Sequence, residues 1–183
     1  MDIRLATLND LTKILELQEK YHVDNLSEAE KMAKGFVTTR FTTAQLTTLI
    51  QQSGAFVAFT EGSRLAAYAL SGTWEFFSQW AIFPLMLSRL PDIRYKNEEL
   101  TTLNSCQYGP VCIDEAFRGK DVLKQLFDAV LADYKPRFPF ILTFINQKNA
   151  RSVKAHTTKL PLEIIDTFAF NNNIYHTLAC PTN

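Results

Sequence analysis

One stretch of the chain, residues 108–127, constrains the fold more than any other. It starts as an apolar run that ends at Ile113, passes through a polar turn containing Arg118-Gly119-Lys120, and continues with apolar residues at helical spacing. We therefore predict a strand, a tight turn and a helix start in direct succession. The N–H groups at such a helix start lack intrahelical partners and lie at the positive end of the helix dipole, which favours a phosphate or diphosphate ligand.

Composition limits the class of protein. With 183 residues, 46% of them hydrophobic and 12% aromatic, the chain is typical of a globular protein, and we expect one domain over residues 1–183. Its 19 basic and 19 acidic residues give no net charge, which disfavours nucleic-acid binding. Three cysteines at no zinc spacing and the absence of a signal-peptide pattern favour a cytoplasmic protein without metal. The apolar segment 74–90 is interrupted and too short to span a membrane.

The first half of the chain predicts a strand, several helices and a hairpin. Asn9 is expected to cap the first helix, Ser27 with Glu30 to form a capping box, and Thr42 or Thr43 to cap a third helix. The expected elements are a strand at 3–5, helices after 9, 27 and 42, a hairpin of strands 55–59 and 65–70, a mostly helical segment 74–90 and a polar loop 91–99.

The second half alternates strands and helices. The expected elements are a strand at 103–113, a helix from 122 that Pro136 closes, a strand at 140–145, a helix at 149–158, and a hairpin of 164–170 and 174–179 around Asn171-Asn172. A strand, a helix and a second strand in succession imply a parallel pair, whereas the two hairpins are antiparallel. We therefore predict an α/β protein with a mixed sheet and helices on its faces.

This order of elements, with the turn at this place, resembles the Gcn5-related N-acetyltransferase (GNAT) family. The pyrophosphate loop of that family reads Gln/Arg-x-x-Gly-x-Gly/Ala. Here Arg118 occupies the first position, and Asp121 and Leu123 replace the two glycines. If the fold is that of the family, the sheet is mostly antiparallel, with a parallel strand pair that splays apart to admit the pantetheine arm.

A second segment carries the resemblance further. Residues 149–160 are similar to the family pattern Asn-x-x-Ser/Ala-x-x-x-Tyr/His, with Asn149, Ser152 and His156 at the marked positions. The usual Gly-Phe pair that follows is replaced by Pro161-Leu162.

The resemblance implies an N-acetyltransferase that moves an acetyl group from acetyl-CoA to an amine of a small molecule or protein, directly in a ternary complex and without metal. By analogy, the end of the long strand pairs with pantetheine and the turn holds the pyrophosphate. The implied cofactor-binding residues are Val111, Cys112, Ile113, Arg118, Gly119, Lys120, Asp121, Val122, Leu123, Asn149 and Ser152. Because the carboxylate of Asp121 would repel a diphosphate, we expect its side chain to face solvent and its N–H to face the ligand.

Candidate catalytic residues follow from the needs of the reaction. His156 stands where many family members place a tyrosine that protonates the departing thiolate, and imidazole suits that task near neutral pH. Tyr108 and Tyr175 are alternative donors, and Glu75 is the nearest candidate for a general base. We expect Cys112 to be inert, because a buried thiol without an activating partner reacts poorly.

Several alternatives stay open at this point. Aromatic residues of the first helices and of segment 74–99 suggest a partly apolar acceptor pocket, a role that competes with ordinary core packing. Both monomer and homodimer are compatible with the sequence. The chain could instead be a catalytically weak acyl-CoA-binding sensor or assembly protein of the same fold. An unrelated nucleotide-binding domain is disfavoured because no complete Walker or dinucleotide signature is present.

Overall fold

The computed structural model describes all 183 residues. They form two compact units: unit 1 comprises residues 1–71 and 109–131, and unit 2 comprises residues 72–108 and 132–183. Strand β6 (Ser105–Ile113) and helix α6 (Val122–Tyr134) each have residues in both units. No helix is both long enough and apolar enough to cross a bilayer.

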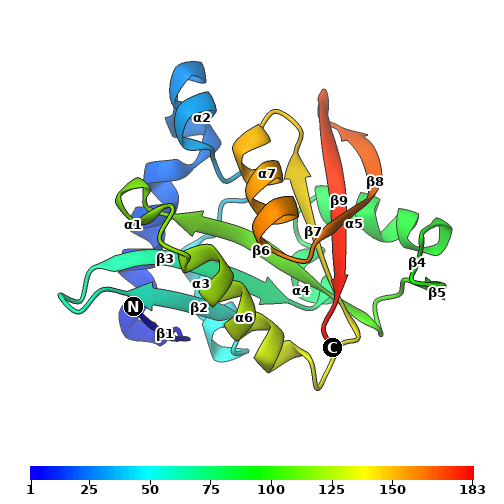
Figure 1. The fold of residues 1–183 in the computed structure, drawn as a ribbon, viewed down its shortest axis with the longest axis horizontal. Helices are drawn as coiled ribbons and strands as arrows, with labels where there is room; N and C mark the ends of the chain where they lie inside the picture. The colour runs from blue at the N-terminus through cyan, green and yellow to red at the C-terminus, as the bar shows by residue number, and fades with distance from the viewer. The chain divides into compact units, whose positions relative to one another are not determined.

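Seven strands form a mixed sheet, as predicted (Figure 1). Their hydrogen-bonded order is β1-β2-β3-β6-β7-β9-β8, and β6 and β7 are parallel. Besides β6, the strands are β1 (Asp2–Leu5), β2 (Ala55–Phe59), β3 (Leu65–Gly72), β7 (Phe140–Asn146), β8 (Glu163–Phe170) and β9 (Asn173–Pro181). Every residue of β2 and β3 is buried, so this hairpin contributes both of its strands to the core.

The start of the first helix differs from the prediction. A 3₁₀ turn, η1 (Leu8–Asp10), precedes helix α1 (Leu11–Tyr21), and Asn9 lies exposed within this turn. The buried carboxylate of Asp10 instead accepts hydrogen bonds from the Thr7 N–H at 2.8 Å and from the Arg4 guanidinium at 2.8 Å. Asp10 provides the negative charge that the helix start favours, and Asn9 is not needed as a cap.

The other helix starts of unit 1 are confirmed. After η2 (Val23–Asn25), helix α2 (Glu28–Lys34) begins with a capping box of Ser27 and Glu30. Helix α3 (Thr43–Gln51) begins with a second box, formed by Thr42 and Gln45. These interactions join residues three positions apart, and for that reason they are readable from the sequence.

The segment predicted to be mostly helical is two helices in unit 2. Helix α4 (Trp74–Phe77) and helix α5 (Ile82–Arg89) are followed by the 3₁₀ turn η3 (Leu90–Asp92). The predicted polar loop at 91–99 is wrong, because it contains the short hairpin β4 (Arg94–Tyr95) and β5 (Glu98–Glu99). Lys96 and Asn97 have φ values of 52° and 68°, the left-handed pair that a two-residue hairpin turn requires.

The C-terminal elements of unit 2 agree with prediction. Strand β7 leads to helix α7 (Ala150–Lys159), and β8 and β9 form the final hairpin (Figure 1). Asn171 and Asn172 turn this hairpin with φ values of 45° and 57°. Asparagine tolerates this left-handed region better than most residues do, so the turn was visible in the sequence.

The parallel pairing of β6 with β7 is short. It covers three residue pairs, from Ser105 with Phe140 to Gln107 with Leu142, although both strands continue beyond them. Two residues further along β6, Gly109 has a φ of 108° and is followed by Pro110. Because proline has no N–H to donate, a regular ladder cannot continue through this position. The end of the pairing agrees with the predicted splay.

Candidate functional site

The predicted strand, turn and helix are all present in unit 1. Strand β6 ends at Ile113, a 3₁₀ turn η4 (Glu115–Phe117) follows, and α6 begins at Val122. We call residues 114–121 the β6–α6 turn. Its first residue, Asp114, is buried and caps η4 by accepting a hydrogen bond from the Ala116 N–H at 3.0 Å. The chain therefore leaves β6 along a defined path.

The backbone at the turn keeps the conformation that glycine would favour. Gly119 and Asp121 both have positive φ values, 78° and 62°. Aspartate is among the few residues other than glycine that adopt this region readily, so Asp121 can replace the family's glycine without changing the path of the chain. The Asp121 side chain is exposed, as predicted. A methyl group added to the α-carbon of Gly119 would meet no atom within 4 Å, so the backbone is open on that side.

The start of α6 presents unused backbone donors. The Gln125 N–H donates to the Asp121 carbonyl at 3.1 Å, which is the first helical hydrogen bond of α6. The N–H groups of residues 122–124 therefore have no intrahelical acceptor. The side chains of Val122 and Leu123 are buried, so that these two residues offer a ligand only their backbone. Three donors at the positive end of a 13-residue helix suit a diphosphate.

The cations of this segment have different roles. The Arg118 Nε donates to the Ile113 carbonyl at 2.9 Å, and its guanidinium lies over the Tyr21 ring, so Arg118 braces the turn against β6 and α1. The Lys120 ammonium lies 5.3 Å from the centre of the Phe117 ring. Lys124 pairs with Asp128 one helical turn away, as expected for an ordinary exposed helix face.

The end of β6 offers its backbone rather than its side chains. Val111 and Ile113 are half-buried, and Cys112 is buried. The Cys112 thiol donates to the Leu17 carbonyl of α1 at 3.8 Å, and burial raises the pKa of Cys112 to about 12. A thiol with this pKa is protonated at neutral pH. The expectation that Cys112 is not a nucleophile is therefore supported by its surroundings.

The second predicted segment lies in unit 2, where β7 leads into α7. Asn149 caps α7, as predicted, because its side-chain oxygen accepts a hydrogen bond from the Ser152 N–H at 3.3 Å. One turn further, the buried His156 places Nδ1 2.8 Å from the Ser152 carbonyl oxygen and 3.3 Å from Ser152 Oγ. The three residues of the family-like pattern are therefore in contact: Asn149 caps the helix, and His156 hydrogen-bonds Ser152 in its first turn.

The contact with the Ser152 carbonyl assigns the proton on His156. A carbonyl only accepts, so Nδ1 carries the hydrogen and Nε2 of the neutral ring is left as an acceptor. Burial lowers the pKa of His156, although the hydrogen bond to Ser152 opposes this effect. At neutral pH the ring is therefore mainly neutral, with the lone pair of Nε2 available as an acceptor.

The other candidate catalytic residues of unit 2 differ in their surroundings. The Tyr108 ring lies next to the imidazole of His156, with 6.2 Å between ring centres, and burial raises the pKa of Tyr108 far above its usual value. Tyr175 stacks on Phe168, and burial raises its pKa too. Glu75 is exposed in the first turn of α4. The structure thus brings Tyr108 and His156 together within unit 2.

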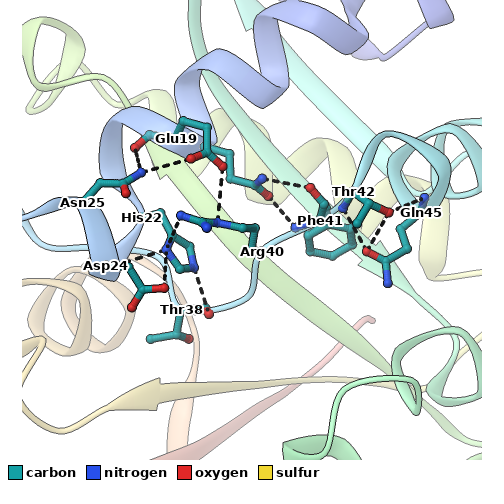
Figure 2. A network of polar contacts seen from close by, with 10 residues as sticks. Glu19, His22, Asp24, Asn25, Thr38, Arg40, Phe41, Thr42 and Gln45 are labelled. Atoms are coloured by element: carbon teal, nitrogen blue, oxygen red, sulfur yellow. Dashed lines mark hydrogen bonds and ion pairs between the residues drawn. The ribbon is translucent and has the colours of Figure 1, made fainter.

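Two polar clusters of unit 1 escaped the sequence analysis. In the first, Asp114 binds Lys20 at 2.9 Å and Arg64 at 3.2 Å, although these residues lie 94 and 50 positions away. In the second, the buried His22 accepts a hydrogen bond from Arg40 at 3.1 Å and contacts the Thr38 carbonyl (Figure 2). Neither cluster has a local sequence signal, because its members come from separate elements.

The aromatic residues considered for the acceptor pocket are mostly core. Tyr21, Phe41, Trp74 and Phe77 are buried, whereas Phe36 and Trp80 are half-buried. Trp74 also donates from its indole N–H to Ser105 Oγ at 3.0 Å. A role in packing therefore accounts for most of this set.

Comparison with solved structures finds similar folds. An acetyltransferase of the GNAT family from Streptococcus agalactiae has a TM-score of 0.69 at 16% identity, covering 98% of this chain and 94% of that one. An N-acetyltransferase from Staphylococcus aureus Mu50 has a TM-score of 0.65 at 18% identity, with coverage of 100% and 98%. The yncA protein of Salmonella typhimurium, solved with its cofactor acetyl-CoA, has a TM-score of 0.64 at 13% identity, with coverage of 100% and 94%. Comparisons with protein-family models and with curated proteins found no match.

Proposed function

The chain has the fold of the GNAT acetyltransferases, and from this premise we propose that it transfers an acetyl group from acetyl-CoA to an amine. The observation that carries the proposal is the open helix start after β6, with positive φ at Gly119 and Asp121. At Asp121, where the family has a glycine, the backbone keeps a positive φ. The three free cysteines agree with a reducing compartment, for which we propose the cytoplasm.

Acetyl-CoA would be held mainly by backbone groups in unit 1. The N–H groups of residues 119–123 would donate to the diphosphate, and the exposed Asp121 carboxylate would stay in solvent. The backbone of Val111, Cys112 and Ile113 would pair with the amides of the pantetheine arm, as an added strand does. The bound cofactor supplies the acetyl thioester.

His156 would handle the proton that the reaction releases. Nδ1 is tied to the Ser152 carbonyl, which fixes the ring and leaves the lone pair of Nε2 to accept the proton that the acceptor amine loses. As imidazolium, the ring would then donate this proton to the departing thiolate, which leaves as the thiol. The lowered pKa of His156 keeps the resting ring neutral and makes the imidazolium a stronger acid, which favours the second step.

The remaining candidates have supporting roles in this proposal. Tyr108 packs beside the imidazole and, with its raised pKa, stays a neutral phenol that can donate but does not ionise near pH 7. Glu75 is exposed, and we propose it as a contact for the positively charged acceptor amine before the amine loses its proton. With Cys112 protonated, direct transfer in a ternary complex is favoured over an acyl-enzyme.

Cofactor binding is tested by thermal unfolding. At a concentration of 100 times Kd, acetyl-CoA should stabilise the protein by about 2.7 kcal/mol, which raises Tm by roughly 5–10 °C for a chain of this size. Free coenzyme A should give a similar shift, whereas ATP and NAD at the same concentration should not. Equal shifts with all four, or none with any, would contradict the proposal.

Turnover is tested by thiol release from acetyl-CoA with a panel of amines. The proposal expects at least one acceptor to release thiol. His156→Asn, which can keep the hydrogen bond to Ser152 but lacks Nε2, should lower kcat by about 100-fold or more and leave the Kd for acetyl-CoA nearly unchanged. Binding without thiol release from any acceptor would instead support the sensor of the same fold. Unaltered kcat in His156→Asn would remove His156 from the mechanism.

A further inference from the structure

A group of cationic side chains at the β6–α6 turn has no role in the proposed diphosphate site, which uses backbone N–H groups. The group lies in unit 1, and each member stacks on one of two aromatic rings. Its members, which we call the basic cluster, are Lys20, Arg64, Arg118 and Lys120. They come from α1, from the turn between β2 and β3, and from the β6–α6 turn.

The Phe117 ring holds two of these cations. The guanidinium carbon of Arg64 lies 5.0 Å from its centre, and the ammonium of Lys120 lies 5.3 Å from it. Both distances are within the range of cation–π attraction. Because Phe117 is the last residue of η4, this ring holds the two cations beside the middle of the turn. The Tyr21 ring holds Lys20 and Arg118 in the same way, at 5.1 and 4.9 Å.

The charges of Lys20, Arg64 and Lys120 are only partly balanced, by the one carboxylate of Asp114. Lys20 and Arg64 both bind the same oxygen of Asp114, Oδ2, at 2.9 and 3.2 Å. A single carboxylate cannot neutralise both. Lys120 is held by the Phe117 ring rather than by an acidic group. Since the Arg64 side chain is 58% exposed, it can reach a ligand while the buried Asp114 retains Lys20.

We propose that Arg64 and Lys120 bind the 3′-phosphate of coenzyme A, a phosphate monoester separate from the diphosphate. This inference rests on the proposed function, because it assigns a second anionic group of the same ligand. A phosphate monoester carries a charge between −1 and −2 near pH 7 and accepts bidentate hydrogen bonds from a guanidinium. The α6 donors serve the diphosphate, and the basic cluster supplies the charge that this second group requires.

The experiment compares two ligands that differ only in this phosphate. Calorimetric titration gives Kd for acetyl-CoA and for 3′-dephospho-acetyl-CoA, with the wild-type protein and with Arg64→Gln and Lys120→Gln. The wild type should prefer acetyl-CoA by about 10-fold or more, and each variant should reduce this preference to less than about 3-fold. Lys124→Gln is the matched control, because Lys124 lies on the same helix start but pairs with Asp128. It should keep the wild-type preference.

The outcomes separate this inference from the function on which it rests. A wild-type protein that binds both ligands equally would overturn the 3′-phosphate site and leave cofactor binding intact. A protein that binds neither ligand would refute the proposed function as well. If Arg64→Gln raises the Kd of both ligands by the same factor, Arg64 acts through Asp114 and the shape of the turn. That result would refute the 3′-phosphate site. Restoration of the preference by Arg64→Lys, which keeps the charge, would support the site.

Discussion

The side chain of Gln18 in α1 hydrogen-bonds the backbone of Phe41 in both directions. Its amide donates to the Phe41 carbonyl at 3.0 Å, and its oxygen accepts from the Phe41 N–H at 2.8 Å. Gln18 and Phe41 are both buried, so water cannot replace either bond. Together with the backbone bridge between His22 and Val37, this pair fastens residues 37–41 to the C-terminal half of α1.

Loss of this clamp should destabilise the protein. In Gln18→Ala, the buried Phe41 N–H and carbonyl lose their hydrogen bonds to Gln18, at a cost of about 1–3 kcal/mol for each group. We expect a decrease in the free energy of unfolding of about 2–4 kcal/mol, measured by urea denaturation. Gln45→Ala serves as the control, because Gln45 caps the half-exposed start of α3 and should cost only about 0.5–1 kcal/mol. Equal effects of the two substitutions would contradict this account.

The conformation of Asp121 predicts an order of stability among its substitutions. Asp121→Gly removes the side chain from a residue with a φ of 62° and should leave the stability unchanged or raise it. A β-branched residue is strained at this φ, so Asp121→Val should destabilise the protein by about 1–2 kcal/mol. The same variant should bind acetyl-CoA more weakly, because the donors of α6 are displaced.

Asp121→Asn separates charge from conformation in this series. Asparagine tolerates the left-handed region and lacks the carboxylate, so this variant should be as stable as wild type and bind acetyl-CoA a few-fold more tightly at low salt. Thermal unfolding and calorimetric titration measure both quantities. Should Asp121→Val prove as stable as Asp121→Gly, the positive φ is not retained in solution.

Stability should fall when the pH drops through the range in which free histidine becomes protonated. Burial lowers the pKa of both His22 and His156, and the neighbouring Arg40 lowers that of His22 further. The unfolded chain therefore binds more protons near pH 6 than the folded chain does. The stability that the neutral rings provide is complete above a pH of about 6.5, the unfolded pKa, and is lost progressively below it.

The measurement is Tm between pH 8 and pH 5. Wild type should lose stability below a pH of about 6.5, and His156→Asn should lose less, because its side chain has no proton to gain. Carboxylates with a lowered pKa, such as Asp10 with a pKa of about 2, change the stability mainly at more acidic pH. They therefore do not mask the contribution of the histidines. A wild-type Tm that stays constant from pH 8 to pH 5 would show that the buried histidines do not titrate as described.

Gly54 should not tolerate a side chain. A Cβ at this position would lie 2.3 Å from the Ser71 carbonyl oxygen and 2.5 Å from a methyl carbon of Leu49. Gly54→Ala must therefore move either the backbone of β3 or the end of α3, and we expect a loss of about 1–3 kcal/mol in the free energy of unfolding. Gly62→Ala is the matched control, because its nearest neighbour is Thr60 Oγ1 at 3.8 Å. Two variants of equal stability would contradict the close approach.

The elements that the sequence predicted correctly depend on neighbours along the chain. Capping boxes at Ser27 and Thr42 join residues three positions apart, and the stripe of α6 recurs within each helical turn. The strand, turn and helix that end at α6 were found for the same reason. Asn149, Ser152 and His156 form one helix start, so their pattern in the sequence is also a contact in space.

Only the tertiary structure determined the polar contacts that fix these elements. Lys20 reaches Asp114 across 94 residues, and Arg89 reaches Asp166 across 77. The sequence named Asp121 as a departure from glycine and predicted that its side chain is exposed, but only the fold shows that its φ is positive. Periodicity and capping reflect interactions between residues a few positions apart, so the sequence shows them. Contacts between distant elements depend on how the whole chain folds.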